Sequence, residues 1–108
     1  MREEPTPRRD TLLLIITGYL TVDPAQRDAF VAAHHDLLAR ARRAPGCLDI
    51  AITADPLDPA RVNNLERWES REHIDAWRRV ANAPDTGIAI RSDTVMEYSV
   101  DGVRPPFG

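Results

Sequence analysis

Alternation of apolar and polar residues is the main pattern in this chain, and it predicts four β-strands. In the segment C-L-D-I-A-I-T-A at 47–54, for example, Leu48, Ile50 and Ile52 fall on one face of an extended strand. Turn-forming residues such as D-P-L-D-P-A separate this strand from the next. The four predicted strands are 11–22, 47–54, 61–69 and 94–100.

The first predicted strand is apolar on both of its faces, because L-L-L-I-I at 12–16 leaves no polar position at its start. The chain has too few helices to cover both faces of a sheet. We therefore expect a homodimer in which the open sheet faces of two copies pack together. Gly18, in the middle of the strand, predicts a bulge or a close approach by another segment.

Apolar residues spaced three and four apart predict two helices. The first follows a cap at Asp23 and runs to about Arg43, and the second follows a cap at Ser70 and ends before N-A-P-D-T-G at 82–87. The order of elements is β-α-β-β-α-β. This order predicts an α+β, ferredoxin-like fold with both helices on one face of a four-stranded antiparallel sheet.

A chain of 108 residues predicts one folded domain. We expect this domain to span residues 11–102, between a flexible arm at 1–10 and a tail at 103–108. The formal net charge of −3 argues against a nucleic-acid partner. The apolar run at 12–16 is too short to cross a membrane, and the charged N-terminus predicts no signal peptide. Cys47 is the only cysteine, so a reduced, cytoplasmic setting is expected.

Two segments carry a resemblance to a known family. The first begins G-Y-L-T-V-D-P and continues to A-P-G-C, and the second reads V-N-N-L-E-R-W-E-S-R-E. Over roughly residues 12–100 the chain resembles the antibiotic biosynthesis monooxygenases, which are dimeric α+β barrel proteins. The closest functional pattern is that of the anthrone and quinol monooxygenases. The resemblance implies a reaction of O2 with a phenolic, anthrone or quinol-type aromatic molecule, without metal, flavin or haem.

Asn64 and Trp68 match an asparagine and a tryptophan, four residues apart, that act in those monooxygenases. The resemblance implies that both orient the substrate and stabilise its anion. A tyrosine that follows the tryptophan by six residues in that group is Ile74 here. Arg91 is the nearest candidate for an arginine that also belongs to the site.

Strand geometry adds to this interpretation. Side chains alternate between faces, so Asn64, Glu66 and Trp68 share one face and Asn63 points the opposite way. We expect Asn64 and Trp68 to line a cavity between sheet and helices, where the Asn64 amide and the Trp68 indole N–H could both donate to a substrate oxyanion. Asn63 is expected to face the dimer side of the sheet or solvent.

Two further residues are candidates for proton transfer. His34 lies on the apolar stripe of the first helix with Phe30, where it could take the substrate proton or simply hydrogen-bond at the helix border. Glu66 is a candidate base, and a salt bridge to Arg78 is the plainer alternative. Beyond the catalytic candidates Asn64, Trp68 and His34, the candidate substrate-binding residues are Tyr19, Phe30, Glu66, Ile74, Trp77 and Arg91.

Two other functions stay open. A non-catalytic dimer of the same fold could bind a small aromatic molecule, and the isoleucine at position 74 favours this alternative. A haem-handling protein is disfavoured, because relatives that degrade haem carry a histidine ligand about ten residues after the tryptophan, where this chain has Trp77 and Arg78. No metal site is predicted, since His34 and His35 lack the spacing of a helical metal pair.

Overall fold

The computed structural model describes residues 12–108, so the arm predicted at 1–10 lies outside the described residues. The strands are β1 (Leu13–Thr21), β2 (Cys47–Ala54), β3 (Arg61–Trp68), β4 (Ser92–Asp93) and β5 (Met96–Val100). The helical segments are a single 3-10 turn, η2 (Pro24–Gln26), and the helices α1 (Arg27–Ala33), α2 (His35–Arg42) and α3 (Arg71–Arg78). None of these helices is long and apolar enough to cross a membrane.

The strands form one antiparallel sheet in the order β2-β3-β1-β4, with β5 also paired to β1. The last two strands follow one another along the same edge of β1 and keep one register, because Thr17 lies opposite Met96 and Leu20 opposite Asp93. The predicted ferredoxin-like α+β fold is therefore confirmed. The sheet has five strands rather than four, since the strand predicted at 94–100 is divided and its pairing begins earlier, at Ser92.

The division falls at Thr94, beside Gly18. The Thr94 hydroxyl accepts a hydrogen bond from the Tyr19 backbone N–H at 3.1 Å, in place of a backbone carbonyl. A Cβ atom on Gly18 would lie 2.8 Å from both the Thr94 carbonyl oxygen and the Val95 Cα. The close approach predicted at Gly18 is thus confirmed, and only glycine leaves room for it.

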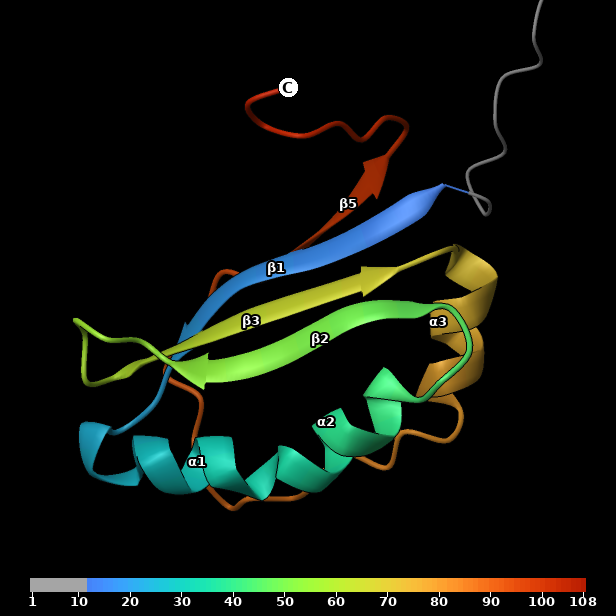
Figure 1. Cartoon of the computed structure of the whole chain (residues 1–108). Coiled ribbons are helices and arrows are strands. Elements are labelled where there is room, and N and C mark those ends of the chain that lie inside the picture. The colour runs from blue at the N-terminus through green and yellow to red at the C-terminus, as the bar shows by residue number, and fades with distance from the viewer. Residues whose placement is uncertain (1–11) are drawn as a thin grey trace, which may run out of the picture.

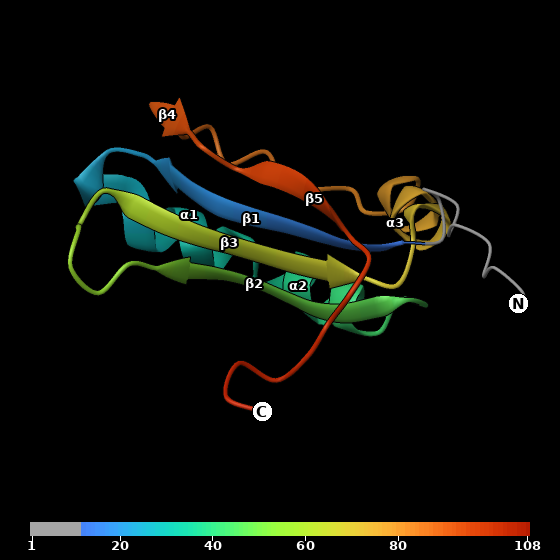
Figure 2. The ribbon, with the colours of Figure 1, turned by 90° about the horizontal axis from the view of Figure 1, so that it is seen from above.

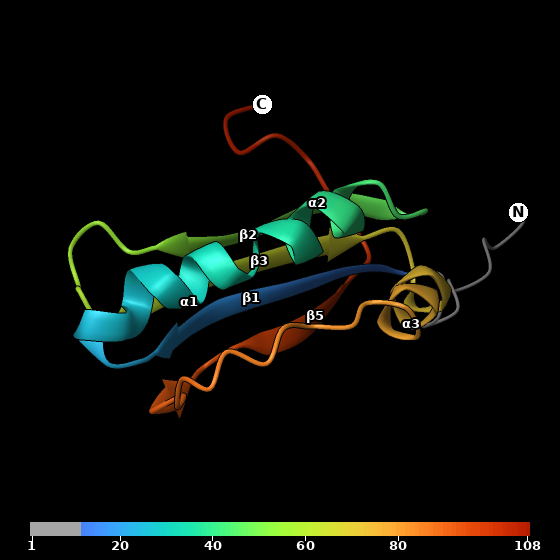
Figure 3. The same cartoon turned by 90° about the horizontal axis from the view of Figure 1, so that it is seen from below.

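The helices cover one face of the sheet. Figure 1 shows α1 and α2 along this face and α3 at the end of β3, and Figure 3 shows that the segment between α3 and β4 runs along the same side. The hydrophobic core lies between these layers. Its buried residues are Leu14, Ile16, Leu20, Val22, Phe30, Ala41, Ile50, Val62, Trp68, Ile74 and Trp77.

The helix predicted from Asp23 to about Arg43 is interrupted at His34. The His34 ring donates from Nδ1 to the Phe30 carbonyl at 2.7 Å, and the His34 backbone N–H bonds to the Val31 carbonyl at 3.1 Å. The ring thereby takes the carbonyl that a regular helix would offer to the backbone. Two short helices, α1 and α2, result where the apolar spacing predicted one.

The second predicted helix agrees more closely with the structure. Ser70 caps α3 by accepting a hydrogen bond from the His73 backbone N–H at 3.2 Å. Ile74 and Trp77 are buried on its inner face, as predicted. Gly46, at the turn after α2, has a φ of 81° and packs against the His73 side chain.

No helix of residues 12–108 covers the opposite face of the sheet, which Figure 2 shows from above. Its side chains come from the odd-numbered positions of β1 and from the positions paired with them, including Tyr98 opposite Ile15. Met96 is 60% exposed and Tyr98 52% exposed on this face. An apolar face of this kind in a small domain indicates an interaction surface.

Candidate functional site

A cavity of about 150 Å³ lies between the helix-covered face of the sheet and the helices α2 and α3. Five of its lining residues are apolar or aromatic, and they enclose a small number of polar groups, which is typical of small-molecule sites. The lining residues are Leu37, Ile50, Ala51, Ile52, Asn64, Glu66, Trp77 and Arg78.

Asn64 is the most unusual group in this cavity. Its Oδ1 atom is buried, and among the buried side-chain oxygen and nitrogen atoms of residues 12–108 it is the one without a hydrogen-bond partner. A buried polar atom left unpaired costs a folded protein about 1–3 kcal/mol, so such atoms are rare and often functional. The amide oxygen of Asn64 therefore remains free to accept a hydrogen bond from a ligand.

Glu66 and Trp68 are hydrogen-bonded to each other. The Trp68 Nε1–H donates to Glu66 Oε1 at 3.0 Å, and the Trp68 ring is fully buried. Glu66 is half-buried beside the cavity, between Ile16 of β1 and Ile50 of β2. Among the described residues no ion pair joins Glu66 to Arg78, so the predicted salt bridge is not present. The Trp68 N–H, predicted to point at the substrate, points at Glu66.

The strand assignment of the two asparagines is as predicted. Asn64 lies on the face of the helices, whereas the Asn63 amide donates to Asp55 Oδ1 at 2.9 Å and accepts from the Arg61 guanidinium at 2.7 Å. These bonds lie at a hollow on the open face of the sheet. Hydrogen bonds from Asn63 and from backbone N–H groups lower the pKa of the Asp55 carboxyl to about 2.

Trp77 forms one wall of the cavity. Its ring stacks against Trp68 with 6.3 Å between ring centroids, and the Arg40 guanidinium lies 5.6 Å from its centroid. Arg78, the next residue, is exposed and lines the cavity. Arg78 was predicted only as a partner for Glu66. Because Arg78 directly follows Trp77 on the inner face of α3, the sequence could have indicated a positively charged side chain at this cavity.

Several predicted site residues do not line this cavity. His34 packs its ring 4.7 Å from that of Phe30, and both belong to the region near α1. Ile74 is fully buried in the core. His34 fits the alternative of a hydrogen-bonded residue at a helix border, because its Nδ1 is taken by the Phe30 carbonyl.

Tyr19 and Arg91 are also outside the cavity. Tyr19 lies on the open face, opposite Asn63, where the Arg61 guanidinium stacks 3.9 Å from its ring centroid. Arg91 pairs with Asp23 at 3.4 Å, and its backbone N–H bonds to the Thr21 carbonyl. Their predicted contacts with a substrate stay predictions, and the geometry of this chain does not bring them to Asn64.

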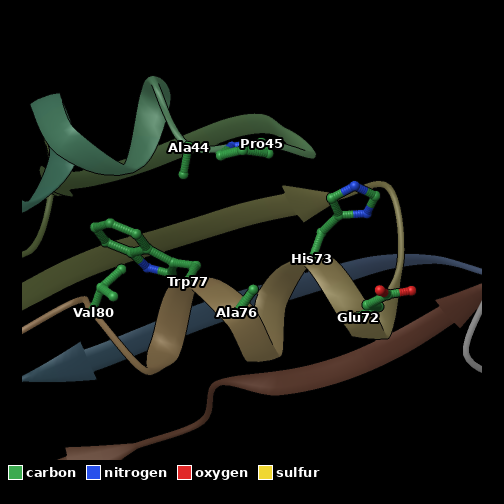
Figure 4. A pocket seen from close by; sticks show the side chains of 7 residues that line it. All are labelled: Ala44, Pro45, Glu72, His73, Ala76, Trp77 and Val80. Atoms are coloured by element: carbon green, nitrogen blue, oxygen red, sulfur yellow. The ribbon is translucent and has the colours of Figure 1, made fainter.

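A larger hollow of about 250 Å³ lies on the other side of Trp77, between the end of α2 and α3. Figure 4 shows it lined by Ala44, Pro45, Glu72, His73, Ala76, Trp77 and Val80. Its walls are largely apolar, and the His73 ring already bonds to the Ser70 hydroxyl at 2.7 Å. The smaller cavity is the better candidate site because it contains the unpaired amide and a carboxylate.

Cys47 and the acidic residues show no sign of metal binding or thiol chemistry. Within the described residues no group of three or more histidine, cysteine, aspartate or glutamate side chains could hold a metal ion. Burial raises the pKa of the Cys47 thiol, and the nearby Asp49 and Glu66 carboxylates raise it further. The thiol form is therefore favoured, in line with a structural cysteine.

Fold and site together define a class: a small ferredoxin-like domain with a ligand-sized cavity between sheet and helices. The profile of the family described as antibiotic biosynthesis monooxygenase matches residues 13–83, which is more than half of the chain. The chain belongs to this family. Among proteins with curated descriptions, none matches it.

Solved structures give the same fold. A candidate antibiotic biosynthesis monooxygenase from Chloroflexus aurantiacus is 27% identical, with a TM-score of 0.65 over 86% of this chain and 97% of that one. Another candidate from Nitrosomonas europaea is 21% identical, with a TM-score of 0.66 over 86% and 100%. A conserved protein of unknown function from Bacteroides thetaiotaomicron reaches a TM-score of 0.70 at 12% identity, over 83% and 99%.

Proposed function

We propose that this protein is a cofactor-independent monooxygenase that oxidises a phenolic, anthrone or quinol-type aromatic molecule with O2. Membership of the antibiotic biosynthesis monooxygenase family supports a monooxygenase-like function. The observation that carries the proposal is the buried, unpaired Asn64 Oδ1 in a ligand-sized cavity. This oxygen can accept a hydrogen bond from a substrate O–H, and the NH2 group of the same side chain can donate to the oxyanion that forms.

The reaction balances without an external reductant. An electron-rich aromatic substrate loses a proton, and its anion then transfers electrons to O2. A hydroquinone and O2 give a hydroxyquinone and water, and an anthrone and O2 give an anthraquinone and water. In both cases the substrate supplies the electrons that reduce the second oxygen atom. The Asn64 amide would donate a hydrogen bond to the oxyanion that forms.

The same proposal includes a homodimer formed through the open sheet face. This face carries the exposed side chains of Met96 and Tyr98 and the apolar odd-numbered positions at the start of β1. A two-fold axis would let each copy cover the other with the same surface.

A second function, binding without catalysis, is favoured by one specific observation. The Trp68 N–H is already donated to Glu66 at 3.0 Å, which leaves Asn64 as the neutral donor at the cavity. A site with one such donor could hold a phenol without accelerating its oxidation. Oxygen consumption separates the two functions.

The test is oxygen uptake by the purified, metal-stripped protein with hydroquinones and a model anthrone. Uptake well above the spontaneous rate is expected, and Asn64→Ala should lower kcat by roughly 10²–10³-fold, as loss of an oxyanion donor does elsewhere. Asn63→Ala is the matched control, because it removes the neighbouring amide on the other face of the same strand. Absence of uptake with every substrate would contradict catalysis and leave the binding function.

A further inference from the structure

We propose that Glu66 is the proton acceptor of this site, that Trp68 positions it, and that the cavity takes a single-ring phenol or hydroquinone. This inference rests on the proposed function and gives it a base, a positioning residue and a substrate size. The sequence alone offered both His34 and Glu66 as candidates for proton transfer, with a salt bridge to Arg78 as the plainer alternative for Glu66.

The position of Glu66 favours proton transfer. Its carboxylate is half-buried and lines the same cavity as the Asn64 amide, because Glu66 lies two residues further along β3 on the same face. No cation neutralises it by an ion pair within the described residues. An ionised carboxylate can only accept hydrogen bonds, and the bond from Trp68 to Oε1 leaves Oε2 to accept from a ligand O–H.

Trp68 acts through Glu66 rather than on the substrate. Its ring is fully buried and stacked on Trp77, and its single donor is bonded to the carboxylate. Because an indole has no second N–H, Trp68 cannot donate to a substrate oxygen while it holds Glu66. The bond fixes the orientation of the carboxylate.

The chemical step follows from these two neighbours. Glu66 accepts the proton of the substrate O–H, so that the O–H bond breaks and its electron pair stays on the substrate oxygen. The Asn64 amide then donates to the resulting oxyanion. A ring carbon of the anion then forms a bond to O2, the oxidant of the proposed function, and the resulting peroxide anion takes the proton back from Glu66. The hydroperoxide loses its ring C–H proton while its O–O bond breaks, so that the ring carbon becomes a carbonyl and the outer oxygen leaves as water.

The size of the cavity selects among aromatic substrates. A protein cavity of about 150 Å³ is known to accept benzene, and this cavity has about the same volume. The side chains of Leu37, Ile50 and Trp77 supply flat and apolar walls for one ring. A fused tricyclic anthrone would not fit without displacement of these walls.

Charged groups on the elements around Glu66 influence how kcat depends on pH. Arg78 of α3 lines the cavity, and Arg42 of α2 bonds to the Ile50 carbonyl at 2.8 Å. From β2 the Cys47 thiol has a raised pKa, and Asp49 lies beside it. On β5 the Glu97 carboxylate is paired with Arg71 of α3. Because its pKa is raised, the Cys47 thiol stays protonated at neutral pH.

Oxygen uptake by the full chain with hydroquinone tests the role of Glu66. Glu66→Gln keeps the shape and an acceptor for Trp68 but cannot take a proton, and kcat should fall by roughly 10²–10⁴-fold. In Trp68→Phe the carboxylate loses the donor that orients it, so kcat should fall while the KM for hydroquinone stays near the wild-type value. Glu72→Gln, an exposed change on α3, should leave kcat and the pH–rate profile as in wild type.

If the wild type consumes no oxygen, calorimetry under nitrogen measures binding without turnover. It tests whether Glu66 accepts a hydrogen bond from the O–H group of the ligand. Hydroquinone should bind roughly tenfold more tightly than 1,4-dimethoxybenzene, which has no O–H to donate, and more tightly than anthrone. Glu66→Gln should abolish the preference for hydroquinone over its dimethyl ether, because the free side-chain group becomes a donor.

Oxygen uptake and ligand binding test the proposed oxygenase and the role of Glu66 separately. Absence of oxygen uptake together with a Glu66-dependent preference for the free hydroquinone would contradict the oxygenase and support the assignment of Glu66. Equal binding of hydroquinone and its dimethyl ether to the wild type, or no binding at all, would overturn the inference. So would a Glu66→Gln variant with wild-type kcat and pH profile, or tighter binding of anthrone.

Discussion

Adjacent asparagines on β3 lie in different surroundings because one step along a strand changes the face. Asn63 is bonded to Asp55 and Arg61 at the open face, and Asn64 has a buried, unpaired Oδ1 on the helix side. Asn63 thus stabilises the turn that joins β2 to β3, whereas Asn64 is costly for the fold and available to a ligand.

The Asn63–Asp55 bond predicts how stability depends on pH. The Asp55 pKa is about 2 in the folded protein and 3.8 ordinarily, so the unfolded state binds the proton first as pH falls. The contribution of Asp55 is therefore fully present above pH 3.8 and is lost as the pH falls towards 2. In Asn63→Ala, an NMR titration should show the Asp55 pKa nearer to 3.8. An unchanged pKa would mean that the backbone donors alone lower it.

Gly46 predicts a large effect of a small substitution. In Gly46→Ala a left-handed φ of 81° would be strained, and the new Cβ would lie 2.2 Å from the His73 Cγ. We expect the free energy of unfolding to fall by about 2–4 kcal/mol. Gly87→Ala is the matched control, since its φ is 66° and its Cβ would meet nothing within 4 Å. Equal losses in denaturant unfolding would show that the contact with His73 is easily relieved.

At the scale of elements, the helices of this chain are short and depend on local bonds at their ends. α3 has eight residues, and its hydroxyl cap at Ser70 places Trp77 against Trp68 two turns later. A helix of this length gains little from propensity alone. The cap and the buried inner face therefore hold one wall of the cavity in place.

Ser70→Ala should lower the free energy of unfolding by about 1 kcal/mol, because the His73 backbone N–H loses its acceptor. Ser70→Asp keeps an acceptor at the cap and should recover most of this loss. Thermal unfolding followed by circular dichroism measures both. The role of the cap would be refuted if Ser70→Ala melted like wild type, or if Ser70→Asp lost as much as alanine.

At the scale of the whole molecule, we propose that the uncovered sheet face sets the state of assembly. Wild type is expected to be a dimer by light scattering, and Met96→Glu, which places a charge on this face, should give a monomer. Leu57→Glu is the control, because Leu57 is 92% exposed in the turn between β2 and β3. A monomeric wild type, or a dimer that tolerates Met96→Glu, would contradict assembly through this face.

The fold class and the two faces of β3 follow from local patterns in the sequence. Alternation and caps depend on neighbouring residues, so they predicted the strands at 47–54 and 61–69, the start of α3 at Ser70, and the opposite directions of Asn63 and Asn64. The same local signals did not reveal the interruption at His34, because apolar spacing is blind to a side chain that takes a backbone carbonyl.

Only the tertiary structure decided which polar groups meet. The bond from Trp68 to Glu66 depends on the depth at which the indole is buried between sheet and α3, and the position of Arg78 depends on the angle of that helix. Tyr19 and Arg91 lie away from the cavity because strand pairing and the approach of the segment before β4 fix their places. These are relations between segments distant in sequence, and a single sequence does not encode their distances in any local pattern.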